Sequence, residues 1–199
     1  MGPSAPGCDD RPMTDYSIPR PVSGDVVDLI LDDHRLFETL LREMRDSTAD
    51  RAGARAAFAD VLVAHGEAEE QEVYPRLRRR TEDVGEHEVE HGEEEHAEIN
   101  EALLALLECV GTDTQKFDDA VERMNEVLQH HLTEEELTIL NPAREDVSDD
   151  DRAQLGQKFL AARSEQLDQG CGSVENVQRL VDEARKEGLL GEDEETSEG

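Results

Sequence analysis

The chain has 199 residues and a formal net charge of −31, which argues against non-specific binding to nucleic acid or an anionic membrane, because the phosphates would be repelled. Aromatic residues make up only 3% and the apolar residues are mainly Leu, Val and Ala, so helices are favoured over sheets. No apolar run reaches the roughly 18 residues of a membrane-spanning helix, and three cysteines without a Cys-x-x-Cys spacing fit a reducing cytoplasm better than a disulfide framework.

The first predicted helix carries a histidine on its apolar side. Residues 1–22 are rich in Pro, Gly, Ser and Asp and are predicted to be disordered. Ser23 is predicted to cap a helix that extends to about residue 46. Its core-facing stripe follows helical spacing and consists of Ile30, His34, Phe37, Leu41 and Met44.

The second predicted helix, over residues 52–79, combines a histidine and a glutamate on its apolar face. His65 and Glu69 continue its apolar stripe, four residues apart, and therefore lie one above the other. Pro75 is predicted to kink the helix, because proline has no backbone N–H to donate.

The third predicted helix, over residues 82–110, has several histidines, of which one faces the core. His96 continues the apolar stripe. His91 lies five residues earlier, about 140° around an ideal helix, and His87 is also off the stripe. His91 is kept as a candidate ligand only if the helix is irregular.

The fourth predicted helix, over residues 113–140, repeats the pattern of the second. His131 lies on the apolar stripe and His130 does not, so His131 is chosen. Asn141 and Pro142 are predicted to end the helix, because the residue before a proline avoids helical geometry.

Two shorter helices are predicted after the fourth. Ser148 caps the first of them, over residues 149–168, and Ser173 caps the second, over residues 174–186. Neither shows obvious chemistry, and we expect them to lie against the other helices or to form contacts in a homodimer. An acidic tail, residues 189–199, is predicted to be disordered.

The predicted fold class is all-α. Four long amphipathic helices with short connections form an up-down-up-down four-helix bundle most easily. The bundle would span residues 23–142, and residues 143–188 would form an extension with two additional C-terminal helices.

The histidines and glutamates on the four stripes predict a metal site. Six buried ionisable groups without partners would each cost several kcal/mol, and a pair of cations would satisfy all of them. Imidazole and carboxylate together suit iron, manganese or zinc, and six donors are too many for one tetrahedral zinc. The predicted ligands are His34, His65, Glu69, His96, His131 and Glu135.

Three neighbours of these ligands have open roles. Glu70 and Glu136 follow the two ligand glutamates directly and could either hydrogen-bond to the histidines or be surface charge. Tyr74 is close enough in sequence to Glu69 to reach the site, although a packing role is favoured.

The order and spacing of these residues resemble the hemerythrin-like, or HHE cation-binding, domain. The matching motifs cover about residues 24–142. The resemblance implies a four-helix bundle with two non-haem iron ions, bridged by an oxo or hydroxo group and by Glu69 and Glu135, with iron preferred to manganese or zinc. The matching motifs are Asp33-His34-Arg35, His65-x-x-x-Glu69-Glu70 to Tyr74-Pro75, Glu95-His96-Ala97-Glu98-Ile99 and His131-x-x-x-Glu135-Glu136.

One departure from the family pattern affects the expected function. Hemerythrins that carry dioxygen have His-x-x-x-His on the third helix, whereas the position four before His96 is Gly92 and the position four after it is Asn100. Only four clear histidines remain, which argues against simple reversible dioxygen carriage and predicts an open coordination position.

Three functions remain open at this stage. The first is a di-iron protein that binds or senses dioxygen, iron, or reactive oxygen or nitrogen species, with a small diatomic molecule or peroxide as its ligand. The second is a di-iron enzyme that decomposes peroxide or oxidises iron. The third is a structural bundle whose histidines only fill the core.

Overall fold

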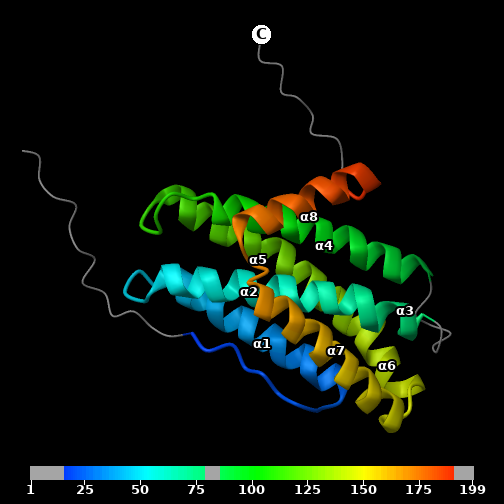
Figure 1. Cartoon of the computed structure of the whole chain (residues 1–199). Helices are drawn as coiled ribbons and strands as arrows, with labels where there is room; N and C mark the ends of the chain where they lie inside the picture. Colours follow the sequence, from blue (N-terminus) through cyan, green and yellow to red (C-terminus); the bar gives the residue numbers. More distant parts are fainter. Residues whose placement is uncertain (1–15, 79–85, 191–199) are drawn as a thin grey trace, which may run out of the picture.

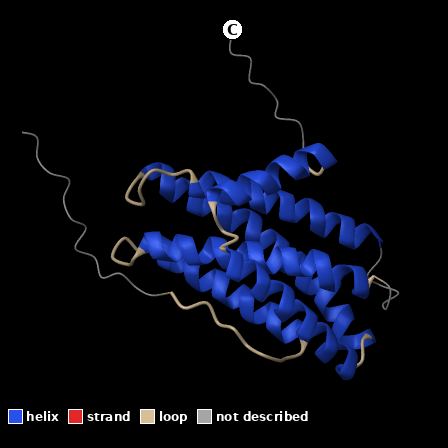
Figure 2. Ribbon diagram, in the orientation of Figure 1, coloured by secondary structure: helices blue, strands red, loops and turns tan. Residues whose placement is uncertain are grey.

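The described part of the structure consists of helices and the loops that join them. The computed structural model describes residues 16–78 and 86–190, without the side chains of residues 86–90 and 93. Within these ranges there is no strand (Figure 2). The elements in chain order are α1 (Val26–Arg45), α2 (Arg51–Ala68), the π-helical turn η1 (Glu69–Val73), α3 (Tyr74–Leu77), α4 (Glu86–Leu107), α5 (Gln115–Glu135), the π-helical turn η2 (Glu136–Leu140), α6 (Asn141–Asp146), α7 (Asp149–Gln169) and α8 (Val174–Glu187).

The helices α1, α2, α4 and α5 form the predicted four-helix bundle (Figure 1). α1 packs against α2 and α5, and α4 packs against α5 and α2. Outside the bundle, α7 covers α1 and α2, while α8 lies along α4. The all-α fold with two additional C-terminal helices is thus confirmed, and a homodimer through the outer faces of α7 or α8 stays a prediction.

Side-chain caps fix where the helices begin. Ser148 and Ser173 cap α7 and α8 as predicted. The predicted cap of the first helix, Ser23, is wrong, because Asp25 takes that role and its Oδ1 accepts a first-turn N–H at 2.9 Å. The other oxygen of Asp25 accepts from Nε of Arg152 on α7 at 2.7 Å, so this cap also ties α1 to α7.

The two prolines follow π-helical turns. Pro142 does not end the fourth helix as predicted, since helical structure continues to Asp146, and the kink expected at Pro75 stays a prediction. In each case a π-helical turn comes first, and the residue before the proline donates its N–H to the carbonyl five residues back. The proline then lies in the first turn of the next helix, where no backbone donor is needed.

Residues 16–22, which were predicted to be disordered as part of residues 1–22, have a defined path in the structure. They run in an extended path along α1 and α7, and Tyr16 Oη lies 3.2 Å from Glu43 Oε2. Arg163 of α7 donates to the carbonyl of Pro19 at 3.0 Å. The rest of the predicted lead-in and nearly all of the acidic tail lie outside the described residues, as does the predicted start of the third helix.

The apolar core is divided in two by a layer of polar side chains. One cluster contains Phe37, Phe58 and Phe117 with the residues around them, and the other contains Ile30 and Phe159 with theirs. Three of the candidate ligands, His34, His65 and Glu135, lie between the residues of the two clusters along the chain. The polar layer therefore has apolar packing on both sides.

Candidate metal centre

All six predicted ligands meet in this polar layer. Each is at most 6% exposed. Two groups of donor atoms form there, and within each group one donor atom per residue lies within 4.8 Å of the others. The first group is His34, His65, Glu69 and Glu135, and the second is Glu69, His96 and His131. Glu69 belongs to both groups, so it is placed to bridge two cations.

Every one of the four histidines has a carboxylate on Nδ1. These contacts fix the ring orientations and leave each Nε2 facing the centre of the layer. Their partners differ from the ligands and come from another helix in each case. The pairs are His34 with Glu136 at 3.0 Å, His65 with Asp33 at 3.3 Å, His96 with Glu70 at 2.8 Å and His131 with Glu95 at 2.9 Å.

Glu70 and Glu136, whose roles the sequence left open, therefore hydrogen-bond to histidines. Asp33 and Glu95 do the same and were missed by the sequence analysis. A signal for them exists, because each directly precedes the stripe histidine of its helix.

The same pattern of contacts occurs in both halves of the bundle, of which α1 and α2 with η1 form one and α4 and α5 with η2 form the other. The acidic residue before the first histidine of a half binds the second histidine of the same half. The acidic residue after the ligand glutamate binds the first histidine of the other half. The corresponding residues are Asp33, His34, His65, Glu69 and Glu70 in one half and Glu95, His96, His131, Glu135 and Glu136 in the other.

Four inward-facing atoms of the ligands lack hydrogen-bond partners among the described residues. They are Nε2 of His34, Nε2 of His65, Oε1 of Glu69 and Oε2 of Glu135. Nε2 of His34 lies 3.2 Å from Glu135 Oε2, and Nε2 of His65 lies 3.1 Å from Glu69 Oε2, but without hydrogen-bond geometry. Two histidine nitrogens, Nε2 of His96 and of His131, face each other at 3.2 Å. Buried polar atoms without partners are costly. Cations bound between them would remove that cost, so this donor set fits a metal pair.

Proton binding in the metal-free layer follows from the same contacts. Burial alone would lower the pKa of His65, but the carboxylates of Glu69 and Asp33 outweigh it and raise that pKa to about 10. Burial would raise the pKa of Glu135, but its contacts with His34 lower it. In the metal-free layer a protonated His65 therefore lies among ionised carboxylates, and a bound cation would compete with that proton.

α7 contributes directly to this layer, which corrects the expectation that the last two helices show no chemistry. Arg163 is 2% exposed and donates from Nε and Nη2 to the two oxygens of Asp33, both at 2.7 Å. Burial would raise the pKa of Asp33, but His65 and Arg163 outweigh it and lower that pKa. Arg163 therefore keeps Asp33 ionised as the partner of His65.

Tyr74 reaches the centre, so the preference for a pure packing role is wrong. Its hydroxyl lies 3.2 Å from Glu135 Oε1, 3.4 Å from Glu69 Oε2 and 3.5 Å from His96 Nε2. The ring of Tyr74 fills the space beside Gly92, the position at which this sequence lacks a fifth histidine, and an added Cβ there would lie 3.4 Å from the ring. The open coordination position stays a prediction.

The remaining histidines with described side chains stay outside the six. The side chain of His130 is 62% exposed, in agreement with the choice of His131. His91 does not join the six, because its side chain is 44% exposed and contacts Glu134 of α5 instead of the buried ligands. His87 lies outside the residues whose side chains are described.

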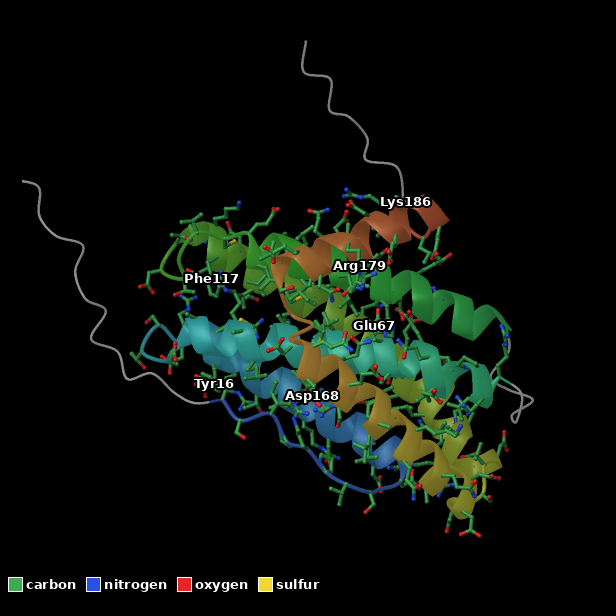
Figure 3. The ribbon with its side chains drawn as sticks, viewed as in Figure 1. Tyr16, Glu67, Phe117, Asp168, Arg179 and Lys186 are labelled. Atoms are coloured by element: carbon green, nitrogen blue, oxygen red, sulfur yellow. The ribbon has the colours of Figure 1, made fainter. Side chains whose placement is uncertain are left out.

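Two pockets among the described residues each reach more than one of the six ligands. A pocket of about 150 Å³ reaches His65, His96 and His131, and α8 forms part of its wall. Glu67 of α2 also lines this pocket. Figure 3 shows Arg179 of α8 above Glu67, and the two charges interact. A second pocket, of about 170 Å³, reaches His131 and Glu135 from the opposite edge of α4.

Comparison with known proteins agrees with this geometry. Residues 25–143 match the family model of the hemerythrin HHE cation binding domain. The chain belongs to this family. Its family and its clusters of histidine and glutamate together indicate a metal-ion-binding protein.

Similar proteins add less detail. A DNA nickase of Nostoc sp. strain PCC 7120 is 28% identical over 142 residues, which are 70% of this HHE protein but only 39% of that relative. This chain therefore spans about two fifths of the length of the relative it matches. No solved structure matches. In the part of this HHE protein that the structure describes, no helix is both long and apolar enough to cross a membrane.

Proposed function

We propose that the protein holds two iron ions, bridged by an oxo or hydroxo group, on the six ligands and that it binds or senses dioxygen, peroxide or nitric oxide. The observation that carries this proposal is that four imidazole Nε2 atoms and two carboxylates converge, with every Nδ1 held by a separate carboxylate. A donor set of nitrogen and oxygen suits iron, and carboxylates shared between two positions suit a pair. Bound iron would supply the exchange of electrons with such ligands.

The residues around the layer support ligand binding in a buried site. The two apolar clusters lie on either side of the layer, and the two pockets that reach it, of about 150 and 170 Å³, have volumes suited to small ligands. Tyr74 offers a hydroxyl that can donate a hydrogen bond toward the centre. Burial and the carboxylates of Glu135 and Glu69 raise the pKa of Tyr74 well above its ordinary value, so the hydroxyl keeps its proton.

A second candidate is an enzyme that decomposes peroxide or oxidises iron. The position of Tyr74 favours it, because a neutral phenol beside Glu135 can hold or pass a proton. Peroxide decomposition that disappears in His131→Ala would support the enzyme. A reversible spectral change with dioxygen, without turnover, would support binding or sensing.

We extend the proposal neither to DNA nor to any activity of the longer relative. This chain spans 39% of that DNA nickase, and its net charge of −31 would repel phosphates. We further propose that it works in the reducing cytoplasm, because Cys109 and Cys171 are buried free thiols.

Metal analysis and absorption spectra test the proposal. Protein produced with iron should contain two iron ions per chain and show an oxo-to-iron charge-transfer band in the near ultraviolet. His34→Ala and His96→Ala each remove a ligand from one group and should reduce both signals. Glu98→Gln changes an exposed carboxylate on the same helix as His96 and should change neither. Wild-type protein without bound metal and without the band would show that the proposal is wrong.

A further inference from the structure

A second cluster of donor groups lies outside the six ligands, on the surface between α4 and α5. His91 and Glu95 come from α4, and His130 and Glu134 come from α5. One donor atom of each lies within 4.8 Å of the others. His91 Nε2 is 3.2 Å from Glu134 Oε2, and the remaining separations between histidine nitrogens and carboxylate oxygens are 3.6–3.8 Å. Ligands at about 2.1 Å around a tetrahedral cation are ~3.4 Å apart, so the cluster has the dimensions of a cation site.

Glu95 connects this cluster to the metal centre. Its Oε2 accepts from Nδ1 of the ligand His131 at 2.9 Å. Its Oε1 is buried, accepts no hydrogen bond from the described residues and faces His91 and His130 at 3.8 and 3.6 Å. The Glu95 side chain is 9% exposed, so an ionised oxygen without a strong partner is costly at this position.

The symmetry between the two halves shows what is missing beside Glu95. Its counterpart Asp33 also binds a ligand histidine, and both oxygens of Asp33 receive the guanidinium of Arg163. No described arginine or lysine forms an ion pair with Glu95. A cation bound by the His91 cluster would neutralise the carboxylate of Glu95, as the guanidinium of Arg163 neutralises that of Asp33.

The cluster also lies at the mouth of a route to the centre. The pocket of about 170 Å³ is lined by His91, Glu95 and Glu134 and, further in, by His131 and Glu135. Its wall therefore holds donors of the surface cluster and two of the six ligands. A cation released from the surface cluster would meet carboxylates and imidazoles at both ends of this pocket.

We propose that His91, Glu95, His130 and Glu134 form a second site for a divalent transition-metal ion, from which metal passes to the buried centre. Two imidazoles and two carboxylates suit Fe²⁺, Mn²⁺, Co²⁺ or Zn²⁺ better than Mg²⁺ or Ca²⁺, which prefer oxygen ligands alone. The surface site itself is independent of the proposed function, whereas the transfer of metal rests on the buried centre holding a metal.

Cobalt binding tests the surface site. Metal-free full-length protein without a histidine tag is dialysed against micromolar Co²⁺, and bound cobalt is measured by atomic absorption. Wild type should bind one ion more per chain than His91→Ala/His130→Ala, whose substituted side chains are largely outside the core. The isosteric Glu134→Gln should weaken the same ion, and Glu98→Gln/Glu126→Gln, at exposed positions of the same helices, should bind like wild type.

The cobalt counts separate this proposal from the proposed function. Three ions in wild type and two in the double variant support both. One ion in wild type and none in the double variant would support the surface site and contradict the buried pair. Equal counts in the two proteins would overturn the surface site. Far-ultraviolet circular dichroism should show equal helix content in all variants.

Loading kinetics test the transfer of metal. Fe²⁺ is added in air to metal-free protein, and the near-ultraviolet band is followed with time. The double variant should reach the wild-type amplitude several-fold more slowly, because ions then enter without the surface site. A wild-type rate in a variant that has lost the surface ion would overturn the transfer role.

Discussion

Arg163 and Asp33 are joined by two parallel hydrogen bonds of 2.7 Å, although 130 residues separate them in the chain. The pair is almost fully buried, and an oxygen of Asp33 also contacts Nδ1 of His65, which holds the imidazole ring in place. A helix outside the bundle therefore sets the orientation of a ligand inside it.

Loss of this ion pair should destabilise the fold. Arg163→Met leaves the Asp33 carboxylate buried without its cation, and such losses cost about 3–5 kcal/mol. Urea unfolding of the metal-free protein measures the change. Arg179→Met removes an exposed ion pair of α8 and should cost less than about 1 kcal/mol. Equal effects of the two variants would mean that the Arg163 pair has no special role.

Asp33→Asn should weaken metal binding, in addition to the stability that is lost when its ion pair with Arg163 is broken. The amide cannot hold His65 in the same way, and loss of such a partner lowers metal affinity by roughly 10–100-fold. Glu95→Gln should act similarly through His131. Competition with a chelator measures the affinity, and Asp32→Asn, at an exposed neighbour, should leave it unchanged.

Tyr74→Phe should keep the fold and the metal content but change the reactivity. The hydroxyl makes only long contacts of 3.2–3.5 Å, so its removal should change the free energy of unfolding by about 1 kcal/mol. Stopped-flow mixing of the iron-loaded protein with peroxide should show a slower reaction. An unchanged rate would mean that the phenol only fills the space beside Gly92.

The metal-free protein should lose stability as the pH rises above neutrality. The pKa of His65 is raised to about 10 in the folded protein, compared with 6.5 for an unperturbed histidine, which represents the unfolded chain. A raised pKa stabilises the fold fully below pH 6.5, and this contribution is lost as the pH rises toward 10. Thermal unfolding across this range should show the loss without metal and a smaller loss with metal.

Metal binding should also release protons. His65 is protonated in the metal-free protein at neutral pH, and its Nε2 must be free of a proton to bind a cation. Adding metal to a weakly buffered sample should therefore lower its pH, and His65→Ala should release fewer protons. Metal binding without a pH change would contradict a protonated His65 in the metal-free protein.

The buried ligands could be predicted from the chain because they obey the helical period. His34, His65, His96 and His131 each lie on an apolar stripe, and this spacing also excluded His130. The family resemblance then ordered the same residues into a bundle. The fold class and the positions brought together in the polar layer were therefore accessible from the sequence.

The contacts between helices could not be predicted in the same way. Arg163 meets Asp33 only because α7 folds back over α1 and α2, and no local period links the two residues. The place of Tyr74 at the centre depends on a π-helical turn, because an ideal helix would place it about 140° from Glu69, whereas in a π-helical turn residues five apart lie near one face. The chain carries no simple signal for that turn.

The two π-helical turns also bear on how this chain compares with its relatives. Each turn holds one residue more than an α-helical turn would need, and each directly follows or includes a ligand glutamate of its half. A relative without such a turn would align with a gap of one residue between Glu69 and Pro75, or between Glu135 and Pro142. The residues beyond the gap would be rotated by about 100°, so Tyr74 would have no counterpart at the centre even where an alignment paired it with another tyrosine.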